Sequence, residues 1–221
     1  MKKYLLVCLL ALAAACAQAG VGLVDLNKVG MYGMSAGGHT ALSLAGGRWS
    51  EARFRDHCQA HIVDDFPTCV GLMLRLRGDI LDGLKKTVAL AAIRNRFDDP
   101  TWQTHDEPRI KAIVAGVPLA ADFDPASLAN PRVSLGFVTA GQDKWLKPRF
   151  HSSAILQACA RCERIADLPT AGHGALLSPP PPLDRLGETA ADLLGDPPGF
   201  DRSVMPEVDR KIVGFFRRHL L

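Results

Sequence analysis

The sequence predicts an α/β fold with a mostly parallel sheet of about four strands flanked by helices. Compact apolar runs of strand length lie at 110–117 and 133–140, and they lack the alternation of strands with one exposed face. A weaker run follows at 164–168, and a short apolar segment at 28–32 comes before the others. Helical patterns separate these runs, and strands that alternate with helices form parallel, doubly wound sheets.

Helical patterns run from 36 to about 46 and over 206–220. Residues 49–106 have a helical and irregular pattern, and we expect them to form a cap-like insertion over the site. The clearest amphipathic helix in this insertion is 79–94. Its apolar side is expected to carry Ile80, Leu81, Leu84, Val88, Leu90 and Ala91. The prolines of 178–182 exclude a helix interior there.

Composition excludes several classes of protein. The chain has 221 residues, of which 48% are apolar and 22% charged, as in folded globular domains. The net charge of +3 includes Lys2 and Lys3; without them 24 basic residues face 23 acidic ones, or +1. Such a balance predicts no nucleic-acid partner and no footprint for an anionic membrane surface. No apolar run reaches the roughly 20 residues of a membrane-spanning helix, so we expect no integral membrane span.

The first residues resemble an export signal. Lys2 and Lys3 precede an apolar stretch at 4–15, and small residues at Ala17 and Ala19 suit a signal peptidase. We therefore expect 1–19 to be a signal peptide and 20–221 to be an exported domain, periplasmic or secreted. Lipidation at Cys16 is the less favoured alternative, because leucine is missing three residues before it.

Four cysteines remain after such a cleavage, and an oxidising compartment favours disulfides between them. We expect Cys58 to pair with Cys69 and Cys159 with Cys162, the pairings that close local loops. The second pair also has the spacing of a redox dithiol, but it follows a predicted helix at its C-terminal end, where the helix dipole opposes a thiolate. A structural bridge is therefore the favoured interpretation. Zinc would need two further ligands at a matching spacing, and the sequence offers none.

Residues 33–37 read Gly-Met-Ser-Ala-Gly, between a predicted strand and a predicted helix. In that context the G-x-S-x-G pattern indicates a nucleophile elbow, a sharp turn that exposes a serine hydroxyl above the sheet. We expect Ser35 to be the nucleophile. The amide of Ala36, at the start of the helix, is the expected donor to an oxyanion.

A serine hydroxyl needs a general base and an orienting acid, which in this kind of fold follow in the order acid, then histidine. Asp143 comes directly after the strand at 133–140, and His173 follows the strand at 164–168. Asp122 and Asp124, beyond the strand at 110–117, remain alternative acids. His39 is rejected as the base because the elbow turns Ser35 away from its helix. We expect surface or packing positions for His57, His61, His105, His151 and His219.

Three segments carry a family resemblance. Residues 29–42 (VGMYGMSAGGHTAL), 108–114 (PRIKAIV) and 171–177 (AGHGALL) resemble the elbow, the next strand and the histidine loop of one α/β-hydrolase branch, the dienelactone-hydrolase-like and platelet-activating-factor-acetylhydrolase-like proteins. The resemblance covers roughly 24–221. It implies hydrolysis of small carboxylic esters or lactones through a serine acyl-enzyme, with no metal or organic cofactor, and a neutral short-chain ester is the default substrate. A phenylalanine usual in the histidine loop is missing near Ala175 and Leu176.

The family builds four strands before its elbow strand, whereas here that strand begins about nine residues after the expected cleavage site. We therefore expect a partial α/β-hydrolase fold. The second oxyanion amide would be missing, a loss that typically costs about 100- to 1,000-fold in rate. The elbow strand would be an open edge that favours self-association. Two functions follow: a secreted serine hydrolase, or a catalytically impaired remnant or binding module that retains the same three residues.

Overall fold

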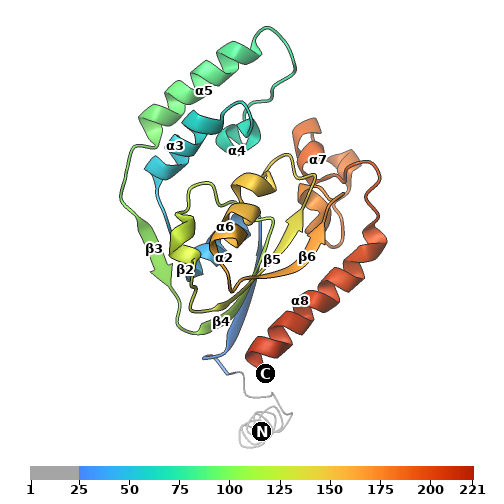
Figure 1. Cartoon of the computed structure of the whole chain (residues 1–221). Helices are drawn as coiled ribbons and strands as arrows, with labels where there is room; N and C mark the ends of the chain where they lie inside the picture. The colour runs from blue at the N-terminus through green and yellow to red at the C-terminus, as the bar shows by residue number, and fades with distance from the viewer. Residues whose placement is uncertain (1–24) are drawn as a thin grey trace, which may run out of the picture.

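The computed structural model describes residues 25–221, so the expected signal peptide lies outside the described residues. Its main sheet has four parallel strands in the spatial order β1-β4-β5-β6. These strands are β1 (Val29–Met34), β4 (Ile110–Gly116), β5 (Ser134–Ala140) and β6 (Glu163–Leu168). The predicted α/β class and the expected number of parallel strands are thus confirmed (Figure 1).

The two central strands are apolar on both faces because helices cover both. All of β4 except Lys111 is buried, and so is all of β5 except Ser134. Helices α2 (Ala36–Leu44) and α6 (Ser152–Ala158) pack on the face that carries Ile113 and Phe137. Helix α8 (Met205–Leu220) packs on the opposite face. Continuous rather than alternating apolar runs in the sequence reflect this double coverage.

Helix α8 confirms the expected C-terminal helix. Its buried Val208 and Phe215 belong to the core of one sheet face, and Ile212 and Phe216 pack against that core. The helix also covers β1, because a Cβ on Gly30 would lie 2.7 Å from Leu220 Cδ1. Strand β1 pairs only with β4 among the described residues and so forms one edge of the main sheet. Self-association through this edge stays a prediction.

A second, two-stranded antiparallel sheet is absent from the sequence prediction. It joins β2 (Ala45–Trp49) to β3 (Gln103–Asp106). The helical pattern expected to reach about residue 46 therefore ends at Leu44 instead. Gly46 and Gly47 are poor helix formers, and the partner strand lies more than 50 residues further along the chain, so local pattern alone does not reveal the pairing.

Residues 51–97, which lie between these two strands, are here called the helical insertion. They form α3 (Glu51–His61), α4 (Phe66–Val70) and α5 (Asp82–Arg96) around a small core of their own. Figure 1 shows them beyond the end of the sheet toward which β5 and β6 point. The prediction of a helical segment here is correct, while its action as a cap over the site stays a proposal.

The expected apolar side of helix α5 is divided between solvent and core. Ile80, just before the helix, is 98% exposed, Leu84 61% and Val88 54%, whereas Leu90 packs against the core of the insertion. Ala89 and Ile93 are buried instead and pack in the core of the insertion. Helix α5 therefore packs in the insertion through Ala89, Leu90 and Ile93 and leaves Leu84 and Val88 exposed.

Both expected cysteine pairs lie at disulfide distance. Cys58 of α3 and Cys69 of α4 have Cα atoms 5.7 Å apart, and those of Cys159 and Cys162, after α6, are 5.4 Å apart. Such pairs are typical of oxidising compartments; export itself stays a prediction.

The rest of the described chain is short helices and loops. Helix α7 (Glu188–Leu194) lies between the histidine loop and α8, and the proline tract is irregular as expected. Single-turn 3-10 helices span Pro125–Leu128, Pro148–Phe150, His173–Leu176, Leu183–Arg185 and Arg202–Val204. Within 25–221 no helix combines the length and the apolar character that crossing a bilayer requires.

Candidate functional site

The turn between β1 and α2 holds Ser35 in an unusual backbone conformation. Its φ of 57° lies in the left-handed region, which non-glycine residues rarely adopt. Its N–H donates to the carbonyl of Gly116 (3.0 Å), and its own carbonyl accepts from Leu119 N–H (3.2 Å). Such strain typically costs about 1–3 kcal/mol and persists only where the surroundings enforce it. The end of β4 and the loop after it thus hold the turn in place.

Two glycines make this turn possible. A Cβ on Gly33 would collide with the carbonyl of Gly37, and one on Gly38 would lie 2.7 Å from Pro118 Cα. At Gly37, the second glycine of the motif, a Cβ would meet open space instead. The close packing of this turn therefore depends on Gly33 and on Gly38, which directly follows the motif.

The structure brings together the three side chains singled out in the sequence. His173 Nε2 lies 2.9 Å from Ser35 Oγ, and His173 Nδ1 lies 2.7 Å from Asp143 Oδ2. The histidine and aspartate side chains are buried, while Ser35 is partly exposed. With the Nδ1 proton donated to the carboxylate, Nε2 is free to accept the hydroxyl proton of Ser35. The arrangement can remove a proton from an alcohol.

Backbone amides fix the carboxylate of Asp143. Its Oδ1 accepts hydrogen bonds from the N–H groups of Trp145 (2.9 Å) and Leu146 (2.8 Å), just after β5. One carboxylate oxygen is thus held by the loop, and the other faces His173. This division keeps the side chain in one orientation toward the imidazole.

The other predicted candidates lie elsewhere. Asp122 Oδ2 contacts His39 Nε2 at 2.8 Å, and Asp124 accepts from Arg48 Nε at 2.8 Å. Neither is hydrogen-bonded to His173. Ala36 is exposed and is the first residue of α2, so its amide belongs to the N-terminal turn, where helix N–H groups lack intrahelical acceptors.

Sequence reasoning missed a buried polar cluster between the helical insertion and the main body. Asp65 Oδ2 accepts from His57 Nε2 at 2.9 Å and lies 3.5 Å from His151 Nε2, and all three side chains are buried. Burial alone would raise the pKa of Asp65, but hydrogen bonds from His151 and His57 outweigh it and hold the pKa well below its ordinary value. His57 and His151 thus have packing positions, one of the two placements expected for them, and both lie against the Asp65 carboxylate.

This cluster connects with the loop that holds Asp143. Ala120 N–H donates to His151 Nδ1 (2.9 Å), which places the His151 proton on Nε2, 3.1 Å from Thr68 Oγ1. The Thr68 hydroxyl in turn donates to the carbonyl of Trp145 (2.9 Å). Thr68 of α4 therefore bonds the residue whose amide holds Asp143. These contacts join residues far apart in the chain, and no spacing in the sequence signals them.

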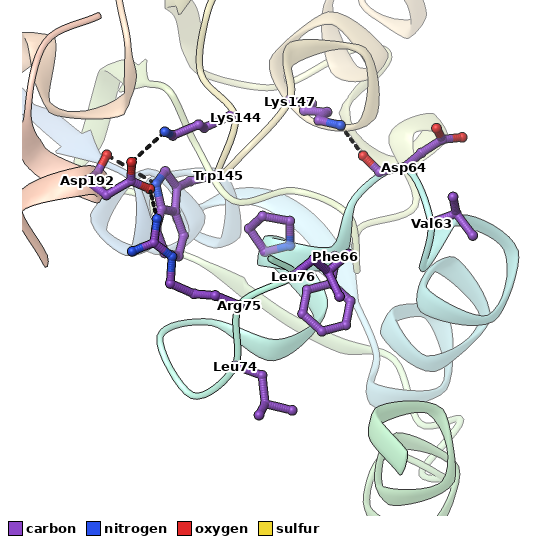
Figure 2. Close-up of a pocket in the computed structure, with 11 residues that line it drawn as sticks. Val63, Asp64, Phe66, Leu74, Arg75, Leu76, Lys144, Trp145, Lys147 and Asp192 are labelled. Atoms are coloured by element: carbon purple, nitrogen blue, oxygen red, sulfur yellow. Dashed lines mark hydrogen bonds and ion pairs between the residues drawn. The ribbon is translucent and has the colours of Figure 1, made fainter. Parts of the chain in front are cut away.

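A cavity of about 350 Å³ lies where the helical insertion meets this loop and α7. Figure 2 shows Phe66, Leu74 and Leu76 of the insertion on one side, and Trp145 beside Asp192 of α7 on the other. A neighbouring cavity of about 470 Å³ shares Trp145 and Asp192 and is also lined by His173. The second cavity therefore borders the histidine loop, whereas the first reaches only the loop after β5, and Ser35 lines neither.

Within residues 25–221 no group of three or more His, Cys, Asp or Glu side chains is arranged to hold a metal ion.

Comparisons with known proteins do not establish a family for this chain. No family model matches the chain, and neither does any curated protein. One matching solved structure is the "Putative Dienelactone Hydrolase" of Klebsiella pneumoniae subsp. pneumoniae MGH 78578, at 12% identity and a TM-score of 0.32. The match covers 64% of this chain and 62% of that one. A likeness at this level says nothing about function, so the resemblance to the dienelactone-hydrolase-like branch stays a prediction.

Proposed function

We propose that this chain is a serine hydrolase that cleaves carboxylic esters or lactones through an acyl-enzyme. The observation that carries the proposal is the continuous hydrogen-bond chain from Ser35 Oγ through His173 to Asp143. The left-handed φ of Ser35 at a strand-to-helix turn supports it independently. A structural serine does not require that strain, and strained backbone conformations gather at functional sites.

In the proposed first half-reaction, Ser35 Oγ attacks the carbonyl carbon of the ester while His173 Nε2 takes the hydroxyl proton. The charge that develops on the carbonyl oxygen is stabilised by the amide of Ala36. Asp143 orients the imidazole and stabilises the imidazolium. When the tetrahedral intermediate collapses, the C–O bond to the alcohol breaks, and the alcohol takes the proton from His173.

In the second half-reaction, His173 removes a proton from water, which attacks the acyl-enzyme carbonyl. The ester bond to Ser35 then breaks, and Ser35 Oγ recovers its proton from the imidazole. With a lactone, the alcohol of the first step stays attached to the acyl group and leaves with the acid. The substrate class that we propose is a small neutral ester.

Hydrolysis of p-nitrophenyl acetate and butyrate tests the proposal. We expect turnover with a burst of p-nitrophenol that matches the enzyme concentration where deacylation is slow. Ser35→Ala should abolish both. Ser43→Ala is the matched control, since its hydroxyl only bonds the carbonyl of His39 on the same helix, α2. A folded chain with no turnover above that of Ser35→Ala would support the catalytically impaired remnant or binding module instead.

A further inference from the structure

The histidine loop is packed against the chain segment that follows α7. A Cβ on Gly172 would lie 2.8 Å from Pro197 Cδ, and one on Gly174 would collide with the carbonyl of Leu194. These two glycines stand on either side of His173, so one neighbouring segment excludes a side chain at both positions. The path of the backbone around the proposed general base therefore depends on what holds the loop and its neighbours together.

Arg202, in the 3-10 helix just before α8, joins these segments. Its guanidinium donates to three backbone carbonyls of the histidine loop, those of Leu177 (2.9 Å), Gly174 (3.2 Å) and Ala175 (3.4 Å). The same guanidinium bonds both carboxylate oxygens of Asp196, through Nε and Nη2. The N–H groups of arginine form a planar fork, which suits several acceptors at fixed positions.

The carbonyls that Arg202 binds lie at and just after the end of the 3-10 helix His173–Leu176. The last carbonyls of a helix have no acceptor role within it, and an arginine nearby can supply the missing donors. The side chains of Arg202 and Asp196 are each 26% exposed, so water competes for these contacts only in part. Hydrogen bonds from a charged donor are also stronger than those between neutral groups.

We propose that Arg202, held by Asp196, is a positioning residue that fixes the backbone of the histidine loop so that His173 stays within reach of Ser35. The inference rests on the proposed hydrolase function. Arg202 acts through the loop, because its hydrogen bonds go to carbonyls that follow His173 and to Asp196. His173 Nε2 lies 2.9 Å from Ser35 Oγ, and a misplacement of about 1 Å between reacting groups can cost about 100-fold in rate.

Replacement of the arginine tests the inference. Arg202→Gln removes both the charge and the fork. We expect kcat for p-nitrophenyl butyrate, corrected for the folded fraction measured by circular dichroism, to fall about 100-fold while KM changes little. Arg202→Lys keeps the charge but offers one ammonium group in place of the fork, so it should recover only part of the loss. Asp196→Asn leaves the guanidinium in place and should cost less than Arg202→Gln.

Arg48→Gln is the matched control. Arg48 also joins two distant segments through a guanidinium on a carboxylate, but its partner is Asp124 and its side chain is 49% exposed. Loss of this pair should leave kcat within about threefold of the parent. A purely structural role for Arg202 predicts the same result for Arg202→Gln, namely a lower free energy of unfolding with kcat per folded molecule unchanged.

A second measurement needs no turnover. The proton between His173 Nδ1 and Asp143 Oδ2 lies in a charge-assisted hydrogen bond, which should place its resonance far downfield in the proton NMR spectrum of the parent. Arg48→Gln should keep this resonance, whereas Arg202→Gln should shift or broaden it. The spectrum therefore separates the two proposals, because a folded parent without turnover contradicts the hydrolase and still reports how His173 is held.

Where the parent turns over, the positioning role is overturned if folded Arg202→Gln or Arg202→Lys keeps the kcat of the parent. Where the parent does not turn over, it is overturned if Arg202→Gln keeps the downfield resonance or if the folded parent lacks that resonance. If Arg202→Gln does not fold, Asp196→Asn decides in its place, and a kcat and a resonance equal to those of the parent overturn the role.

Discussion

The main sheet and the helical insertion differ in how completely they bury their apolar side chains. In the main sheet, helices cover both faces, so that Ile113 on one face and Val114 on the other are fully buried. In the insertion, three short helices enclose a small core, and Leu84 and Val88 stay in solvent. The sheet positions the side chains of the candidate site. Polar contacts join the insertion to it, among them those of Asp65 with His151 and of Thr68 with Trp145.

We therefore expect the two regions to contribute to different properties of the protein. Changes at the carboxyl ends of the strands should affect turnover and leave stability nearly unchanged. Changes in the contacts of the insertion should affect stability first and turnover through it. The following predictions test that separation.

The largest effect is expected at Asp143. Replacement by asparagine removes the acceptor for His173 Nδ1–H and favours the wrong tautomer, so kcat/KM for p-nitrophenyl esters should fall about 10⁴-fold. Asp124→Asn, which removes the acid bound to Arg48, should change kcat/KM less than about threefold. Equal losses in both variants would show that the acid has been assigned wrongly.

Asp65→Asn should act on stability instead. It takes a carboxylate from between two buried imidazoles, and breaking a buried pair typically costs about 3–5 kcal/mol. We expect the free energy of unfolding from guanidinium melts to fall by about that amount, with kcat largely retained in the fraction that stays folded. A stability unchanged from the parent would mean that the cluster does not fasten the insertion.

The carboxylate of Asp65 also predicts that the stability of the fold depends on pH in the acidic range. Because the pKa of Asp65 is lower in the folded than in the unfolded chain, its stabilisation is complete above the unfolded pKa of about 4. It is lost as the pH falls through the lower folded pKa. Guanidinium melts at decreasing pH should show a loss of stability below about pH 4 in the parent that is smaller in Asp65→Asn. Parallel pH curves for the two chains would contradict this.

The two cysteine pairs are expected to stabilise the fold by slightly different amounts. On the loop-entropy model the bridge between Cys58 and Cys69 contributes about 3 kcal/mol, and the shorter loop of Cys159 and Cys162 about 2 kcal/mol. Replacing each pair by alanine should lower the thermal midpoint in that order. Labelling of free thiols before and after reduction establishes that both pairs are oxidised in the parent.

Thr68→Val should give the smallest change. It removes the hydroxyl that bridges His151 and the carbonyl of Trp145, at a cost of about 1–2 kcal/mol. Because this bridge only adjoins the loop of Asp143, we expect kcat to fall a few-fold and KM to stay the same. Thr68→Ser restores the hydroxyl and should restore kcat, which a purely steric role for the threonine methyl would not.

The sequence was most informative where parallel strands end. Ser35, Asp143 and His173 each follow a strand, and the carboxyl ends of parallel strands meet at one edge, so three distant residues were predicted to converge. The pairing of β2 with β3 and the cluster around Asp65 were not predicted, because neither produces a recognisable pattern within a short stretch of sequence. Periodicity identified an apolar side on α5, but it cannot say which of those residues a core covers, and Leu84 and Val88 are exposed.

A fluorophosphonate probe tests the central claim most directly, since it forms a covalent adduct only with an activated serine. We expect the folded chain to gain one adduct, mapped by tandem mass spectrometry to Ser35, with labelling abolished in Ser35→Ala and strongly slowed in His173→Ala. A folded parent chain that takes up no probe, or an adduct that persists in Ser35→Ala, would contradict the proposal that Ser35, His173 and Asp143 act together on a carbonyl.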